Sequence, residues 1–261
     1  MDNTLILKLV LTPVLIGGAS LAGRKWGHAV SGWIVAFPLT SGPVVFFIAL
    51  AHGGNFALNT SLGIMSGGFS LAIFALSYAW VAVKYKWPVA VFVSIGLFLL
   101  TTFILKSIFI PLWPLFFSIL AVFALTLFLM PKHKAGVTEE VEVPRWDLPA
   151  RMIITTLFVF LLTELAPLTG ARLAGLLSTL PIMTATLTVF AHHQHGHASA
   201  NEVIRGLVMG LFSFAFFYLA LSLLLPINIA LAFISAIIAS LVVQGIALWL
   251  IQNRNNTVSA F

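Results

Sequence analysis

Hydroxyl-bearing residues follow a proline at two places, each inside a long apolar stretch where a helix is expected. The two sets are Pro38, Thr40 and Ser41, and Pro181, Thr184 and Thr186. A proline inside a helix donates no backbone hydrogen bond and clashes with the carbonyl four residues before it. We therefore expect both helices to be interrupted and the carbonyls of Ile34 and Leu177 to be freed. Oxygens at such a break could bind a small solute; the alternative is a simple kink whose carbonyl bonds a neighbouring hydroxyl.

Glu164 is the acidic residue that the apolar segments contain away from their ends. A carboxylate inside a membrane span is a candidate proton or cation relay, so Glu164 is a candidate ion-coupling residue. It also lies about a turn from Pro167, near the expected end of its span, from where it could reach the interface or pair with Arg172. The sequence leaves two interpretations open, a coupling group and an interfacial anchor.

Four histidines cluster after the second proline: His192, His193, His195 and His197. Imidazole is a common metal ligand. The chain has no cysteine and no carboxylate directly beside the cluster, so we favour solvated loop histidines over a metal site. Nucleotide-binding loops, nucleophile elbows and zinc-protease motifs are also absent from the sequence. We therefore expect neither a cofactor nor an enzymatic activity.

The composition places these residues in a membrane. Of 261 residues, 61% are hydrophobic and 8% are charged, against about a quarter charged in soluble domains. Apolar stretches near 20 residues long can cross a bilayer as helices, and several here are apolar all round, which excludes the alternating pattern of a β-barrel. The sequence predicts an all-α membrane protein with nine spans at about 4–22, 29–50, 56–83, 88–105, 110–130, 150–167, 173–190, 202–225 and 229–251.

The sequence repeats itself after a shift of 143 positions. The equivalent residues include Pro38 and Pro181, His52 and His195, Gly53 and Gly196, Gly63 and Gly206, and Gly67 and Gly210. Matches of leucine or phenylalanine are expected by chance in an apolar chain, but matched prolines, glycine pairs and a His-Gly pair are not. Because repeats decide architecture, we divide the chain into a first four-helix repeat at 1–108, a linking helix and polar linker at 109–149, and a second repeat at 150–261.

The basic residues predict how the two repeats are oriented. With nine spans, ten of the thirteen lysines and arginines fall on one side of the membrane. The positive-inside rule makes that side cytoplasmic, with the N-terminus outside and the C-terminus inside. An odd number of crossings separates equivalent helices, so the repeats must be inverted relative to each other. We attribute the net charge of +6 to this topology and not to a nucleic-acid partner.

The spacing from glycine to proline in the second helix of each repeat also resembles a known family. The segments 32–38 and 175–181, the second running on to Phe190 and His192, are similar to the GlpM-like family of small bacterial inner-membrane proteins. The resemblance implies a bacterial inner membrane and a single four-helix unit, which here would be present twice. It implies no catalytic residue, and the fused, inverted arrangement departs from it.

Two inverted repeats with discontinuous helices are typical of secondary transporters. We therefore expect a carrier of a small solute or ion that works by alternating access, in the lipid bilayer and with a second copy of the chain as a further candidate partner. The alternatives are a passive channel, a lipid-translocating protein and a membrane assembly factor that transports nothing.

Overall fold

The structure, a computed structural model, describes residues 10–18, 38–131 and 146–258, with side chains up to residue 246. Residues 10–18 are helical. The labelled helices are α3 (Ser41–His52), α4 (Gly54–Lys84), α5 (Trp87–Leu105), α6 (Leu112–Leu129), α7 (Asp147–Thr169), α8 (Ala171–Ser178), α9 (Ile182–Leu224) and α10 (Ile229–Val258). No strand occurs in these ranges, which confirms the prediction of an all-α chain.

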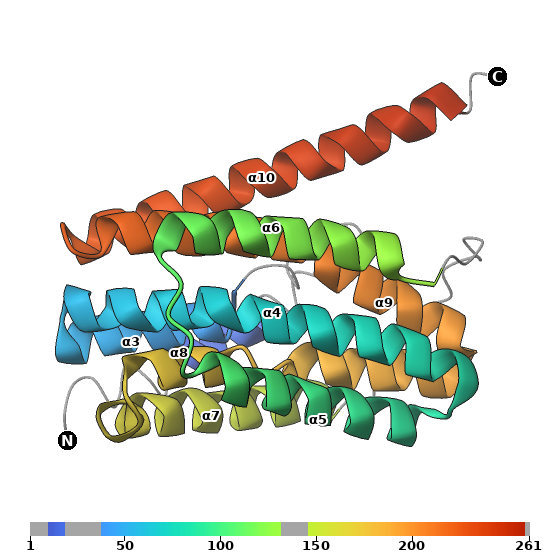
Figure 1. Ribbon diagram of the computed structural model, residues 1–261, viewed down its shortest axis with the longest axis horizontal. Coiled ribbons are helices and arrows are strands. Elements are labelled where there is room, and N and C mark those ends of the chain that lie inside the picture. Colours follow the sequence, from blue (N-terminus) through green and yellow to red (C-terminus); the bar gives the residue numbers. More distant parts are fainter. Residues whose placement is uncertain (1–9, 19–37, 132–145, 259–261) are drawn as a thin grey trace.

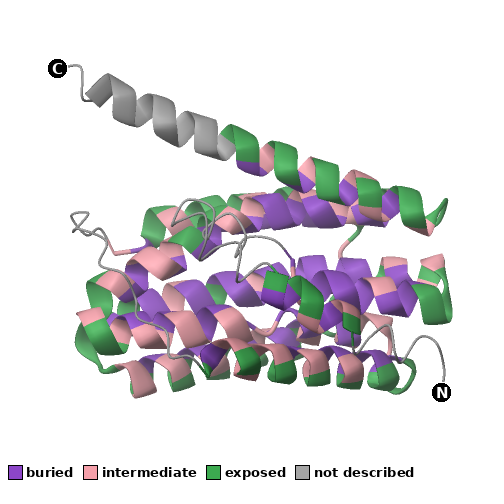
Figure 2. Cartoon of the chain, turned by 180° about the vertical axis from the view of Figure 1, so that it is seen from behind, coloured by how far each residue is buried: buried purple, intermediate pink, exposed green. Residues whose placement is uncertain are grey.

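Six of the described helical segments are long and apolar enough to cross a membrane: α4, α5, α6, α7, the stretch Ala171–Leu224 and the start of α10. Large apolar side chains are exposed on these helices, for example Phe92 on α5 and Phe128 on α6, each 76% exposed. Figure 2 shows exposed residues along the outer sides of the bundle. An apolar surface of this extent suits lipid and not water. The chain is therefore a helical membrane protein, and the count of nine spans stays a prediction.

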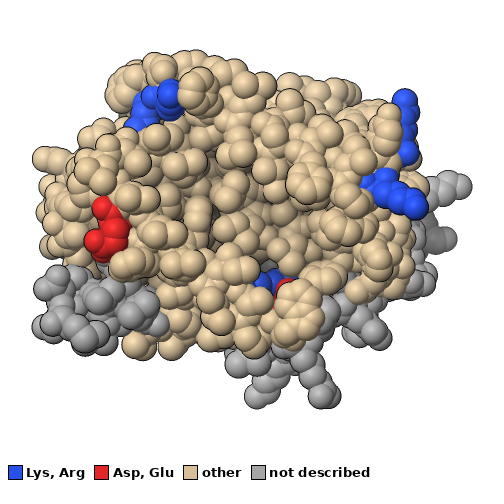
Figure 3. Space-filling model, turned by 90° about the horizontal axis from the view of Figure 1, so that it is seen from below, with Lys and Arg blue, Asp and Glu red and all other residues tan. Residues whose placement is uncertain are grey.

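Charged side chains lie mainly outside the apolar part of the surface. On the face drawn in Figure 3 they gather toward the two ends, apart from one opposed pair at an edge, and a broad uncharged belt lies between them. Lys84 and Lys86 stand where α4 passes into α5, and Lys106 stands where α5 ends. Placing the long apolar helices across a bilayer puts these lysines near the two interfaces, where their charged ends remain in water.

Helix α4 is the centre of the molecule (Figure 1). It packs against α3, α5, α6, α8 and α9, whereas α10 packs mainly against α9 at the edge. Small residues dominate one stretch of α4, from Ser61 to Gly68. Small side chains let helix backbones approach closely, which is how helices associate without a hydrophobic driving force. The composition of α4 thus explains its central place.

Two glycine turns support the repeat. Gly53 joins α3 to α4 with φ 81° and ψ 171°, and Gly196 interrupts α9 with φ 82° and ψ −173°. This conformation is accessible essentially to glycine alone. The chain reverses direction at both points (Figure 1), so α9 consists of two helices joined at Gly196. Residues 143 positions apart in the sequence therefore make the same turn.

One partner of a buried hydrogen bond between helices recurs in register, whereas the other partner does not. In the first repeat, Thr102 of α5 donates to Ser70 of α4 at 2.9 Å. In the second, the equivalent of Ser70 is Ser213 of α9, which bonds Ser240 of α10 at 2.6 Å. All four side chains are buried. Each repeat thus ties its last two helices together with a buried pair of hydroxyls.

Candidate functional site at the helix break

The helix predicted over 173–190 is broken, as the proline pattern indicated. Helix α8 ends at Ser178 and α9 begins at Ile182. Between them, the amide of Thr179 donates to Leu176 at 3.3 Å and that of Ile182 donates to Leu180 at 2.8 Å. Pro181, with φ −80° and ψ 51°, is the centre of an inverse γ-turn. The interruption is therefore a defined three-residue turn inside the protein.

The prediction that Leu177 has a freed carbonyl is wrong. The amide of Leu180 donates to it at 3.0 Å, because the last turn of α8 tightens before the proline. At the break, the carbonyls of Ser178 and Thr179 accept from no backbone donor in the described part of the chain, and both residues are buried. The equivalent expectation for Ile34 lies outside the described residues.

The first repeat shows the same start of a half-helix. Helix α3 begins at Ser41, three residues after the buried Pro38, whose carbonyl accepts from Gly42 at 2.8 Å. Neither Thr40 before α3 nor Pro181 before α9 provides a side-chain cap. The N-terminus of a helix carries a partial positive charge and unsatisfied N–H groups. Two such ends therefore begin inside the molecule without a capping side chain.

The hydroxyls at the two breaks are used differently. Thr186 donates to the Ile182 carbonyl at 2.8 Å, within its own helix. Ser41 instead accepts from the Tyr218 hydroxyl of α9 at 2.7 Å, and both side chains are buried. Thr184 is also buried. Ser41 is therefore the predicted site residue that connects the two repeats directly.

The two predicted sets lie on elements that are in contact. Helix α3, which follows the first break, packs against α8, which leads into the second. A second link between the repeats involves Ser61 of α4, whose hydroxyl donates to the Tyr218 carbonyl at 3.4 Å and is paired with the Ser222 hydroxyl of α9 at 2.9 Å. The site is thus an interface of both repeats.

Glycines of α4 hold the broken helix. A Cβ placed on Gly63 would collide with the Arg172 carbonyl, and one on Gly67 would collide with the Thr179 side chain. On the opposite side, a Cβ on Gly175 would collide with the Thr60 carbonyl. Helices α4 and α8 therefore approach each other closely, and the close approach runs along α8 up to the break.

Glu164 and the histidine cluster lie away from the break in sequence. Glu164 is on the exposed face of α7, in its last two turns. His192 bonds the Tyr78 hydroxyl through Nδ1 at 3.3 Å, and the His193 ring contacts the ring of Trp87. Among the described residues, no group of three or more histidine, aspartate or glutamate side chains could hold a metal ion. The aromatic contacts favour a packing role for His192 and His193.

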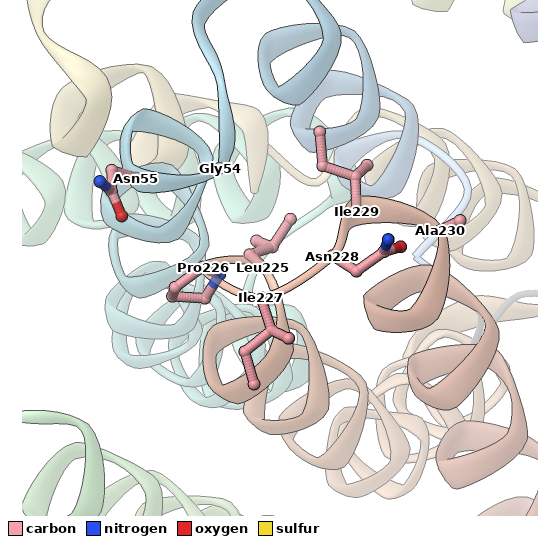
Figure 4. A pocket seen from close by; sticks show the side chains of 8 residues that line it. All are labelled: Gly54, Asn55, Leu225, Pro226, Ile227, Asn228, Ile229 and Ala230. Atoms are coloured by element: carbon pink, nitrogen blue, oxygen red, sulfur yellow. The ribbon is translucent and has the colours of Figure 1, made fainter.

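A hollow of about 540 Å³ opens where the α9–α10 turn meets the start of α4 (Figure 4). Its walls are apolar side chains and the two amides Asn55 and Asn228, with no ionisable group. It lies at the end of the bundle to which the turn belongs, and not at the break. Nothing in its lining indicates a specific ligand.

The sequence analysis did not single out Thr12 and Thr155, which stand 143 positions apart. Both are completely buried, and neither hydroxyl has a hydrogen-bond partner in the described structure. It also treated Arg151 only as a marker of topology, whereas Arg151 is largely buried on α7 and pairs with Asp147 at 2.8 Å. The repeat could have identified the two threonines from the sequence, because they are 143 positions apart, as the two prolines are.

Fold and site together define a helical membrane protein with a buried helix break between two groups of helices. No family model, curated protein or solved structure matches this chain. The resemblance to the GlpM-like family therefore stays a prediction from the spacing of glycine and proline.

Proposed function

We propose that the chain is a secondary transporter that moves a small solute by alternating access between two inverted four-helix repeats. The observation that carries the proposal is the buried break at 179–181, which contacts the other repeat. The solute would bind at the predicted residues of the two breaks, Pro38, Thr40, Ser41, Pro181, Thr184 and Thr186.

The physical argument is the cost of a broken helix at bilayer depth. Irregular backbone is tolerated there only where protein or a polar cavity satisfies it. The tight turn at Pro181 satisfies the carbonyls of Leu176 and Leu177 but leaves those of the buried residues Ser178 and Thr179 without a backbone donor in the described part of the chain. A proline that served only to bend a helix would not need to recur at an equivalent position with hydroxyls following it, as Pro38 and Pro181 do.

The contacts between the repeats are suited to movement. Around α8 they include Gly63 and Gly175 against backbone carbonyls and Gly67 against the Thr179 side chain, and between α4 and α9 they include a few neutral hydroxyl bonds such as Ser61 with Ser222. Such bonds are worth about 0.6 kcal/mol each in membrane proteins, so exchanging them costs little. Rocking of one repeat on the other would open the site to each side in turn, with Glu164 as a candidate coupling group.

We further propose that the protein resides in a bacterial inner membrane, with its N-terminus outside and its C-terminus in the cytoplasm. The ten-to-three distribution of basic residues supports this orientation.

Uptake by the purified protein in liposomes tests the proposed function. Radiolabelled amino acids, carboxylates and sugars would be screened with proton and sodium gradients. We expect saturable uptake of one solute class, reduced at least about tenfold by Thr40→Trp or Thr184→Trp, because a large ring would fill the site. Thr169→Trp, at the exposed end of α7, is the matched control and should transport normally.

Each other outcome has a definite meaning for the proposal. Uptake that both tryptophan variants leave unchanged, in protein that elutes as the wild type does, would contradict the site. Flux that does not saturate would favour a channel, movement of labelled lipid would favour a lipid-translocating protein, and the absence of any flux would favour an assembly factor.

A further inference from the structure

Two polar side chains one turn apart on α7 are buried without a complete set of partners. Arg151 keeps only 15% of its side chain exposed, and Thr155 is completely buried. The Nη2 atom of Arg151 and the hydroxyl of Thr155 have no hydrogen-bond partner in the described structure. Residues four apart lie on the same face of a helix. One face of α7 therefore presents two adjacent polar groups inside the protein.

Asp147 fixes the orientation of the arginine without satisfying it. Its carboxylate accepts from Nε of Arg151 at 2.8 to 2.9 Å, and the aspartate side chain is only 5% exposed. A guanidinium has five N–H groups and no acceptor. The ion pair holds one edge of the group, so Nη2 can only be satisfied by an additional acceptor. Asp147 is in this sense a positioning residue.

The Thr155 hydroxyl lacks a hydrogen-bond partner for a different reason. Thr156, the next residue, donates to the Met152 carbonyl of its own helix at 2.6 Å, as threonines in helices commonly do. Thr155 makes no such bond. A buried hydroxyl is normally paired, so Thr155 differs from its neighbour in having its hydrogen-bonding capacity available.

Thr155 lies near the depth at which α3 begins, and Arg151 lies one turn farther from the shared end of the two helices. Helices α3 and α7 end at the same end of the bundle (Figure 1), and α7 packs against α3 and α8. At 1.5 Å per residue, Thr155 is about 21 Å along α7 from its end at Thr169, and Ser41 is about 16 Å along α3 from its end at His52. The buried stripe of α7, which includes Thr155 and Val159, therefore reaches the start of the half-helix.

The repeat provides an independent argument. Thr12 is the equivalent of Thr155, is equally buried and has an equally unpartnered hydroxyl. The helix that bears it touches α7, since a Cβ on Gly17 would lie 3.4 Å from the end of Met152. A feature that recurs in the same register in both repeats, like the two prolines, points to a shared task.

We propose that Arg151 and Thr155 bind the carboxylate of the transported solute. This inference rests on the proposed function and names its substrate class. An arginine N–H cannot ligate a cation, so this position excludes a site for a bare metal ion. Asp147 balances the charge of Arg151, while the N-terminus of α7 adds a partial positive charge of about one half. One carboxylate oxygen accepting from both Nη2 and the threonine hydroxyl completes the hydrogen bonds of the pair.

Calorimetry on the full-length protein in nanodiscs tests the inference. Acetate, glycine and inorganic phosphate would be titrated at constant ionic strength, with acetamide as the neutral probe. We expect a carboxylate to bind, and Thr155→Val to weaken its affinity about tenfold while leaving the melting temperature unchanged or raised, because no open hydroxyl remains. Thr156→Val, whose wild-type hydroxyl is used within the helix, is the matched control and should stay within about twofold.

A second variant tests whether the loss of affinity in Thr155→Val comes only from a change in structure. Arg151→Lys keeps a cation beside Asp147 but removes the planar guanidinium, and it should weaken carboxylate binding to a similar extent. Three results would each overturn the inference: acetamide binds as tightly as acetate, only phosphate binds, or Thr155→Val binds acetate with the affinity of the wild type. Saturable uptake of neutral solutes alone would overturn the carboxylate site but support the transporter. Carboxylate binding without any uptake would support the site but contradict the transporter.

Discussion

At the scale of single residues, the account depends on how closely α8 and α4 approach. Gly175 stands against the Thr60 carbonyl, and a methyl group there has no flexible neighbour to displace. We predict that Gly175→Ala destabilises the protein by about 1 to 3 kcal/mol, the usual cost of overpacking. Thermal unfolding in detergent measures the effect. Gly96→Ala on α5, where a Cβ meets nothing within 4 Å, is the control and should not lower the melting temperature.

The hydrogen bond between Tyr218 and Ser41 joins the repeats at the first break. Tyr218→Phe removes the donor and leaves the buried Ser41 hydroxyl to find another partner. We predict a loss of about 0.5 to 1.5 kcal/mol in the free energy of unfolding. Tyr85→Phe, at an exposed tyrosine after α4, is the matched control. Equal melting temperatures for the two variants would show that the hydrogen bond between Tyr218 and Ser41 does not stabilise the protein.

Among the structural elements, the turns at Gly53 and Gly196 give the most specific test of the repeat. Gly53 and Gly196 share a backbone conformation that disfavours every residue with a side chain, although neither position lacks space for a methyl group. We therefore predict that Gly53→Ala and Gly196→Ala each cost about 1 to 3 kcal/mol, and similar amounts, because the strain is in the backbone. Chemical or thermal unfolding of the two variants side by side checks this, with Gly206→Ala as the control within a helix. A cost at one turn only would argue against equivalent elements.

The elements also show how far the sequence could predict the structure. Proline and glycine are informative because they act on the backbone, so Pro181 and Gly196 indicated the break and the turn before any contact was known. Leu177 could not be assigned correctly, because the sequence does not tell whether a helix tightens before a proline. Thr155 could not be distinguished from Thr156 because α7 is apolar nearly all round, so periodicity does not identify its inner face.

For the molecule as a whole, we propose that the two repeats lie inverted across one membrane. The turns after α4 and after α9 are equivalent in sequence, yet they lie at opposite ends of the bundle (Figure 1). Inversion gives both ends of the transport path the same architecture and lets small shifts between the repeats change which end is open. A carrier mechanism depends on this arrangement more than on any single side chain.

Cysteine labelling tests inversion most directly, because the natural chain has no cysteine. Tyr85 and Asn228 are equivalent residues in these two turns and are both exposed. We predict that a membrane-impermeant maleimide labels Asn228→Cys in intact cells and labels Tyr85→Cys only after permeabilisation. Labelling of both cysteines from the same side of the membrane would contradict inverted repeats, and with them the account of transport.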